Sequence, residues 1–568
     1  MRQLLLISIC LLSLSIITCS TNNDTQIYDV NISTSPVDAG STTPADTSIE
    51  EGKQLSLSAD ANEKYLFTHW SGDVDSTSTN PLSITIDQSY SITANFKIKS
   101  YELAINTDGQ GVVHEEVLEE KSKDYNHGTI VKLTADPSNH WQFLEWQGAE
   151  TGAQNPLEIT MDKKMEISAV FERKSYPLNI STSGEGDVSL DPNQVEYKYE
   201  KSVELTANPP NGWSFSRWKG DYSGQENPVS LSIDSSMSVT AIFENSKFAG
   251  GNGTQTYPNK VSTLNQLQAV NQYPEAHFKL VNNIDANATE SWNNGKGFNP
   301  IGNSDKPFTG SFNGQNFKIS NLTIDRINED AVGFMGQVKN ADIKNIILEN
   351  VNINGDRVVG GIIAYIFQST FSNSHISGNI SGGTYTGGLV GQNSGSEIIQ
   401  TSADVRVSSD GHSVGGLVGQ SQGTILKSNA KGSVSGNEKV GGLLGWHRDG
   451  EVRNSYTTTD VSGSENIGGI IGRSENATEL STSYSVGSIS GTTNVGGVIG
   501  INNGNISSTY WNTETTNQNN GIGSGSSGGV TGLSTSEMSG NEAKNNMPEF
   551  NWNEIWVTTE NYPILFWE

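Results

Sequence analysis

A short glycine-rich signature recurs through the second half of the chain, and its spacing limits the fold more than any other feature does. The clearest copy reads VGGLVGQSQG from Val414, and a reduced copy, VGFMGQ, starts at Val332. A period of 26 to 28 residues separates the first glycines of successive full copies, which are Gly360, Gly387, Gly415, Gly441, Gly468 and Gly496. This period is too short for a domain but suits one turn of a parallel β-solenoid. We therefore expect stacked coils of short strands, with the glycines at corners whose backbone dihedral angles are closed to other residues.

The segments between the glycine pairs resemble a known repeat. From Val414 to Gly436 the chain reads VGGLVG, then GTIL, a serine and GSVSG. This pattern is similar to the GLUG motif, and the resemblance covers residues 332–511. It implies a right-handed parallel β-helix in a bacterial surface or secreted protein; such proteins include adhesins and some immunoglobulin-cleaving metallopeptidases.

Three longer repeats precede the glycine-rich region. Each opens on an alternating apolar strand and continues into an aromatic hairpin, FTHWSG, FLEWQG or FSRWKG, whose tryptophans are Trp70, Trp146 and Trp218. An Asn-Pro turn follows in each copy. These repeats resemble the divergent internalin-B-like repeats, also called bacterial repeat domains, which implies small all-β modules used in tandem as a stalk. The tryptophans could stack on sugars, but their phenylalanine neighbours favour a role in the core of each module.

The N-terminus predicts export. Arg2 precedes an apolar run from Leu4 to Ile17 that is too short to span a bilayer comfortably, which is typical of a secretory signal peptide. The following Thr18-Cys19-Ser20 resembles the lipobox of bacterial lipoproteins, which implies a lipid on Cys19 and attachment to a membrane. The alternative is an ordinary signal peptide that contains a cysteine. We expect a cell-envelope protein on the outer membrane, facing the exterior.

Together these patterns predict an all-β chain: three tandem β modules, a parallel β-helix and a C-terminal aromatic cap. The cap is expected to fold over the last coil, because an open solenoid end exposes apolar and unpaired groups. The expected boundaries are a signal peptide at 1–18, a tether at 19–27, modules at 28–99, 100–174 and 175–245, a linker at 246–260, the β-helix at 261–515 and the C-terminal loop and cap at 516–568.

Charge and residue spacing argue against several functions. A net charge of −28 offers no basic patch for nucleic acid. The nearest string to a zinc-peptidase motif, beginning at His114, has no second histidine, and the positions where calcium-binding solenoids carry aspartate hold Gln, Trp, Arg and Ile here. We expect no metal, no cofactor and no catalytic residue.

A charged loop after one glycine signature is the candidate ligand contact. Trp446, His447 and Arg448 follow the copy at Val440, and Arg473 holds the position equivalent to Trp446 in the next coil. An aromatic ring beside arginine is a typical binding anchor. The leading hypothesis is a non-catalytic adhesin that binds an extracellular glycan or protein along the rod-like solenoid. The alternatives are a β-helix polysaccharide-degrading lyase or hydrolase and a purely architectural surface protein.

Overall fold

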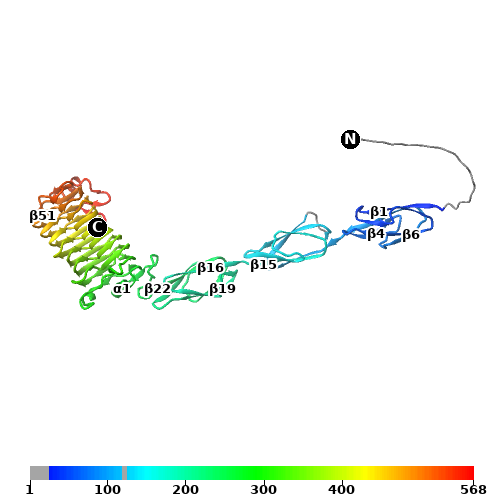
Figure 1. Ribbon diagram of the computed structural model, residues 1–568, viewed down its shortest axis with the longest axis horizontal. Helices are drawn as coiled ribbons and strands as arrows, with labels where there is room; N and C mark the ends of the chain where they lie inside the picture. Colours follow the sequence, from blue (N-terminus) through cyan, green and yellow to red (C-terminus); the bar gives the residue numbers. More distant parts are fainter. Residues whose placement is uncertain (1–24, 118–123) are drawn as a thin grey trace, which may run out of the picture. The chain divides into compact units, whose positions relative to one another are not determined.

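The computed structural model describes residues 25–117 and 124–568, and these residues form an almost entirely β structure (Figure 1). The predicted fold class is confirmed: three repeat modules precede a parallel β-solenoid of about 8 turns. The chain divides into two compact units, of which the first holds the first two modules and the second holds most of the third module and the whole solenoid. No helix in the described part of the chain is long and apolar enough to cross a membrane.

Each module consists of two facing sheets around one tryptophan. In the first module the sheet orders are β3-β1-β7-β5 and β2-β4-β6, and the other two modules repeat this plan. The strands of the first module are β1 (Ile27–Ser35), β2 (Gly40–Thr43), β3 (Thr47–Glu50), β4 (Gln54–Ala61), β5 (Tyr65–Gly72), β6 (Leu82–Thr85) and β7 (Tyr90–Ile98). Those of the second are β8 (Ser100–Tyr101), β9 (Leu103–Asp108), β10 (Gly111–Val117), β11 (Tyr125–Asn126), β12 (Ile130–Pro137), β13 (Trp141–Gly148), β14 (Leu157–Thr160) and β15 (Met165–Arg173). Those of the third are β16 (Ser175–Ser183), β17 (Asp187–Asp191), β18 (Glu196–Lys198), β19 (Lys201–Asn208), β20 (Trp213–Gly220), β21 (Val229–Ile233) and β22 (Met237–Asn245).

The repeated landmarks of the modules have structural roles. Trp70, Trp146 and Trp218 are at most 1% exposed, which confirms that they fill the cores. The asparagine of each Asn-Pro turn pairs with the backbone of an alanine, as in a β ladder. In the second module, Asn155 Oδ1 accepts from the Ala135 N–H at 2.9 Å and Asn155 Nδ2 donates to the Ala135 carbonyl at 2.7 Å. The other modules make the same two bonds. The side-chain amide therefore ties the turn to the inner strand.

Three parallel sheets run along the solenoid. Each complete coil contributes strands to all three sheets, and the first coils contribute to two of them. The groove sheet contains β23 (Asn259–Val261), β24 (His277–Leu280), β26 (Ser311–Asn313), β29 (Met335–Lys339), β30 (Asp342–Lys344), β33 (Ile363–Phe367), β34 (Thr370–Ser372), β37 (Val390–Ile399), β40 (Val418–Leu426), β43 (Leu444–Arg453), β47 (Ile471–Ser474), β48 (Thr478–Ser481), β52 (Ile499–Asn502), β53 (Asn505–Ser507) and β55 (Ile522–Gly525). The tyrosine sheet contains β25 (Ile284–Asp285), β27 (Lys318–Ser320), β28 (Thr323–Asp325), β31 (Ile347–Asn354), β35 (His375–Gly382), β38 (Ser402–Ser409), β41 (Asn429–Ser435), β44 (Tyr456–Thr457), β45 (Asp460–Ser462), β49 (Tyr484–Ser485), β50 (Ile489–Ser490), β54 (Thr509–Asn512) and β56 (Val530–Leu533). The glycine sheet contains β32 (Val358–Gly360), β36 (Tyr385–Gly387), β39 (Ser413–Gly415), β42 (Glu438–Gly441), β46 (Glu465–Gly468) and β51 (Thr493–Gly496).

The glycine signature sets the register of the coils. Gly415 pairs in parallel with Gly387 on one side and with Gly441 on the other. The paired aliphatic residues that follow, such as Leu417 and Val418, are both fully buried. Both side chains face the interior because the chain bends at Gly416-Leu417, between the glycine sheet and the groove sheet.

The reason for the glycines differs from our expectation. The paired signature glycines are absent from the positive-φ residues, so an unusual corner dihedral does not require them. Close packing does. A Cβ on Gly415 would lie 2.1 Å from the Val418 carbonyl oxygen, and one on Gly416 would lie 2.1 Å from the Gly442 carbonyl oxygen. These contacts are with backbone atoms, which cannot swing aside as a side chain can.

The corner between the groove sheet and the tyrosine sheet does use positive φ. Lys427 there has φ of 50°, and the residues one coil away in either direction, Gln400 and Asn454, have φ of 53° and 51°. A buried hydroxyl residue follows each of them. The Ser428 hydroxyl donates to the Leu426 carbonyl at 2.8 Å and accepts from the Thr401 N–H of the preceding coil at 3.2 Å. This ladder explains the serine of the repeat pattern.

The first end of the solenoid is covered by a short helix. Helix α1 (Leu264–Ala269) begins after Thr263, whose side chain accepts from the Gln266 N–H. Leu267 of this helix is fully buried in the solenoid core. The outer edge of β23 is also paired, since the Lys260 N–H donates to the Gly250 carbonyl at 2.8 Å.

The aromatic C-terminal segment covers the solenoid at a place different from the one we expected. Trp511 fills the last turn, where a Cβ on Gly497 or Gly521 would lie 2.3 or 2.6 Å from its ring. The segment after helix α2 (Glu542–Asn546) instead runs back along the tyrosine sheet, and Figure 1 marks the C-terminus beside the solenoid. There Trp567 Nε1 donates to the Lys427 carbonyl at 2.9 Å. These aromatic residues therefore cover the outer face of the tyrosine sheet more than they cover the open end of the solenoid.

Candidate ligand-binding surface

A shallow polar groove crosses the first coils of the groove sheet. It consists of three adjoining depressions with volumes of about 580, 400 and 810 Å³. The first two share Thr309, and the second and third share Asn340 and Asp342, so together they form one continuous surface. The groove follows a bend in the sheet at which Asn340 and Gln368 adopt positive φ.

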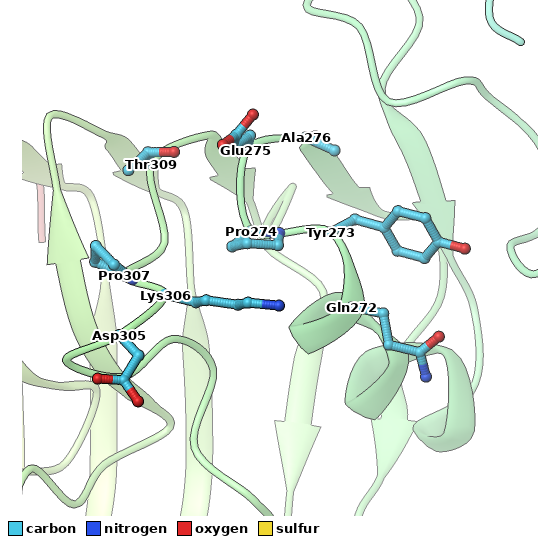
Figure 2. Close-up of a pocket in the computed structure, with 9 residues that line it drawn as sticks. All are labelled: Gln272, Tyr273, Pro274, Glu275, Ala276, Asp305, Lys306, Pro307 and Thr309. Atoms are coloured by element: carbon cyan, nitrogen blue, oxygen red, sulfur yellow. The ribbon is translucent and has the colours of Figure 1, made fainter.

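The first depression lies between a helical turn and a loop (Figure 2). Figure 2 shows the Lys306 side chain extending from its loop toward Pro274 and the turn that carries Gln272. The Tyr273 ring lies on the far side of Pro274, where Lys247 Nζ is 5.7 Å from the ring centroid. The lining thus offers an ammonium group, an amide and apolar proline faces.

An outward-facing column of polar residues lines the rest of the groove. Its members occupy equivalent positions on successive strands, and they are His277, Ser311, Asp342, Thr370 and Glu397. Neighbours bond along the column: His277 Nδ1 lies 2.8 Å from Ser311 Oγ, and Thr370 Oγ1 donates to Asp342 Oδ1 at 3.1 Å. Hydroxyl and carboxylate groups therefore repeat at the strand spacing of about 4.8 Å. Sequence analysis missed this column, although these residues alternate with buried ones in every short strand.

The predicted cluster around Trp446 forms two coils beyond the groove. Trp446 pairs with Arg473 in the next coil, as the spacing predicted. Its indole Nε1 donates to Glu475 Oε1 at 2.9 Å, and Arg473 Nε donates to the same oxygen at 3.1 Å. Arg448 and Lys439 lie over the ring, with the Arg448 guanidinium carbon 4.8 Å and Lys439 Nζ 5.4 Å from the centroid. The ring is half-buried and held in place by these contacts.

His447 is not on this surface, which contradicts the ligand contact we predicted for it. Its side chain is fully buried inside the solenoid, in a column whose adjacent members are Ser421 and Ser474. Neither ring nitrogen has a hydrogen-bond partner. Burial lowers the pKa of His447 to about 3. The alternation of the strand turns this residue inward because Trp446 before it points outward.

The remaining predicted site residue, Cys19, lies outside the described residues, so its lipidation stays a prediction. In the part of the chain that the structure describes, no group of three or more His, Cys, Asp or Glu side chains could hold a metal ion.

Two carboxylates occupy equivalent places on adjacent coils of the groove sheet. Glu451 pairs in register with Glu479. Arg453 Nε lies 2.9 Å from Glu451 Oε1, so this carboxylate has a cationic partner.

Comparisons with known proteins identify the modules. Residues 30–100, 101–175 and 176–247 each match the profile of the divergent InlB B-repeat domain. Halomucin of Haloquadratum walsbyi is 38% identical over 168 residues, which are 28% of this chain and 2% of halomucin. A protein of Evansella cellulosilytica, provisionally described as a Gly-rich membrane protein, is 31% identical over 141 residues, which are 24% of this chain and 16% of that protein. The chain thus spans only a small part of these relatives.

Two solved structures are also similar. A protein of Bacteroides ovatus, provisionally described as an immunoglobulin A1 protease, has a TM-score of 0.41 at 22% identity, over 57% of this chain and 96% of that one. An IgA1 protease has a TM-score of 0.31 at 15% identity, over 60% of this chain and 29% of that one. From the family match and the fold together, the chain consists of three divergent InlB B-repeat domains followed by a parallel β-solenoid.

Proposed function

We propose that this is a bacterial cell-surface protein whose solenoid binds an extended, hydroxyl-rich polymer, in the first instance a polysaccharide. The observation that carries the proposal is the continuous groove with its column of polar side chains. A linear polymer laid across the coils would meet a similar set of donors and acceptors at each strand. One sequence relative is named halomucin and the other is described as a membrane protein, and both names support a surface setting. Attachment through a lipid on Cys19, with the solenoid facing the exterior, is part of the same proposal.

The charges in the groove favour a ligand with little net charge over most of its length. The charged side chains that line the three depressions nearly balance, and Lys344 forms an ion pair with Asp342. The acidic ones are Glu275, Asp305, Asp342 and Glu397, and the basic ones are Lys279, Lys306 and Lys344. Amide side chains such as Gln315 and Gln368 complete the lining. Uncharged hydroxyl groups can both donate to and accept from such a surface.

Glycan-array binding with matched variants tests the proposal. The purified chain from Ser20 onward should bind a polysaccharide, and Asp342→Asn should weaken binding by about tenfold, as expected for the loss of a hydrogen bond to a charged group. Asp404→Asn is the control, because Asp404 is exposed on the tyrosine sheet, outside the groove. Equal loss in both variants, or binding that survives in isolated modules alone, would contradict the proposal. Failure to bind any glycan or matrix protein would favour an architectural role.

The carboxylate pair supports a second candidate, a polysaccharide-degrading enzyme. The register of adjacent strands places Glu451 and Glu479 side by side, and a pair of neighbouring carboxyl groups is the arrangement that glycoside hydrolases use. Release of new reducing ends from a bound polysaccharide, abolished by Glu479→Gln, would establish this activity. Binding without release would favour the non-catalytic function.

A further inference from the structure

Arg448 is an extra residue in the coil that carries Trp446. Between strands β40 and β43, Ser421 pairs with His447 and Gln422 pairs with Asp449, so Arg448 has no counterpart on β40. A β-bulge of this kind bends the strand and redirects the side chain of the inserted residue. Here the Arg448 side chain is exposed and lies over the Trp446 ring at 4.8 Å.

Three of the nearby carboxylates already have cationic partners, and the carboxylate of Asp449, next to Arg448, accepts from the Gly450 N–H at 2.8 Å. Glu475 accepts from Arg473, and Glu451 pairs with Arg453 at 2.9 Å. Glu438 pairs with Lys439 and lies 3.1 Å from His412 Nδ1. Among the described residues, Arg448 has no carboxylate within ion-pair distance, so its guanidinium group is held against the indole with its donors facing solvent.

The bulge lies at the same bend that forms the groove. Ser394, next to the groove residue Gly395, pairs with Gln422, which in turn pairs with Asp449 beside Arg448. Two strand spacings, about 10 Å, therefore separate the end of the groove from Arg448 along the solenoid. A polymer that occupies the groove and continues along the bend would reach this side chain.

The same patch also contains a buried side-chain amide that has no hydrogen-bond partner. Gln420 precedes Trp446 by one coil in the same outward column. It is 1% exposed, and neither its amide oxygen nor its amide nitrogen has a hydrogen-bond partner. Buried amides without partners are rare in folded proteins, so this one marks a polar position in the patch that the protein itself leaves unsatisfied.

We propose that Arg448 is an anion subsite at the end of the groove, which binds a carboxylate or sulfate group on the polysaccharide. A guanidinium fork binds either anion through two parallel hydrogen bonds, and the indole beneath it fixes the fork in place. This inference rests on the proposed function, since it assigns charged substituents to the polymer that the groove would hold.

Binding to three soluble polymers of one backbone tests the assignment: dextran as the neutral probe, sparsely carboxymethylated dextran for carboxylate groups and sparsely sulfated dextran for sulfate groups. The wild-type protein should bind one of the acidic polymers at least fivefold more tightly than dextran in 50 mM salt, and this preference should shrink in 300 mM salt. Arg448→Gln should abolish the preference and leave dextran binding unchanged. Arg448→Lys should keep only part of it, because it retains the charge but not the fork.

Arg453→Gln is the matched control, since Arg453 lies on the same strand but is paired with Glu451. Equal loss in the two variants would assign the effect to general charge and overturn the subsite. Wild-type binding to dextran without preference for either acidic polymer would overturn the subsite and leave the proposed function standing. Absence of binding to all three polymers and to a glycan array would contradict both the anion subsite and the proposed function. The unfolding temperature of each variant shows whether a loss comes from misfolding.

Discussion

Replacement of His447 by asparagine should remove a large acid-dependent loss of stability from the solenoid. The imidazole is fully buried without a hydrogen-bond partner, in a column that holds asparagine two coils away on either side, at Asn393 and Asn502. Asparagine is therefore compatible with this position. It cannot take up a proton in the acidic range, whereas histidine can.

The size of the effect follows from proton linkage. The pKa of His447 is lowered by burial from 6.5 to about 3 in the folded chain. The unfolded chain therefore binds a proton on His447 below pH 6.5, and the folded chain does not until about pH 3. Stability is fully present above pH 6.5 and falls by about 1.4 kcal/mol for each pH unit below it. The loss amounts to about 2 kcal/mol at pH 5 and about 4 kcal/mol at pH 3.

Hydrogen exchange read by mass spectrometry measures this loss in the solenoid separately from the modules. Peptides from β40, β43 and β47 report the free energy of opening in the wild type and in His447→Asn at several pH values. Carboxylates contribute equally to both proteins, so the difference between them isolates His447. The wild type should lose about 2 kcal/mol relative to the variant between pH 8 and pH 5. A difference that stays constant over this range would refute the reasoning.

Three further predictions concern packing. Gly416→Ala should destabilise the solenoid by about 3 kcal/mol, because its Cβ would lie 2.1 Å from a carbonyl oxygen, whereas Gly528→Ala should have no effect because nothing lies within 4 Å of its Cβ; chemical unfolding of both variants checks this, and equal stabilities would contradict it. Trp146→Ala should cost about 3–5 kcal/mol in the second module alone, seen as faster hydrogen exchange in residues 101–175; unchanged exchange there would show that the ring is not needed for packing. Deletion of residues 551–568 should expose Tyr456 and Tyr484 and cause aggregation in light scattering; a monomer with an unchanged melting temperature would argue against a covering role.

The coil register and the module cores were predictable from the sequence because both depend on strict repetition. The spacing of the glycine pairs predicted the pairing of Gly387, Gly415 and Gly441, and the Trp446–Arg473 neighbour relation followed from the same count. The repeated tryptophans predicted buried rings for a similar reason. A feature that recurs at a fixed period must occupy equivalent places in the structure.

Features that depend on a single coil were not predictable in this way. The bulge at Arg448 arises from one inserted residue in β43, which no periodic pattern reveals. The groove depends on how the strands bend around Asn340 and Gln368. The path of the C-terminal segment depends on long-range contacts, such as the 2.8 Å hydrogen bond from the Tyr456 hydroxyl to Glu568 Oε2.

Hydroxyl-radical footprinting of the protein with and without a bound polysaccharide tests the central claim most directly, because it maps the contact surface along the whole chain. The account predicts protection of the groove residues in segments 272–279, 305–315, 340–344 and 395–397, and of the Trp446–Arg448 patch when the polymer is acidic. Protection confined to the three modules, with the groove sheet unchanged, would contradict it.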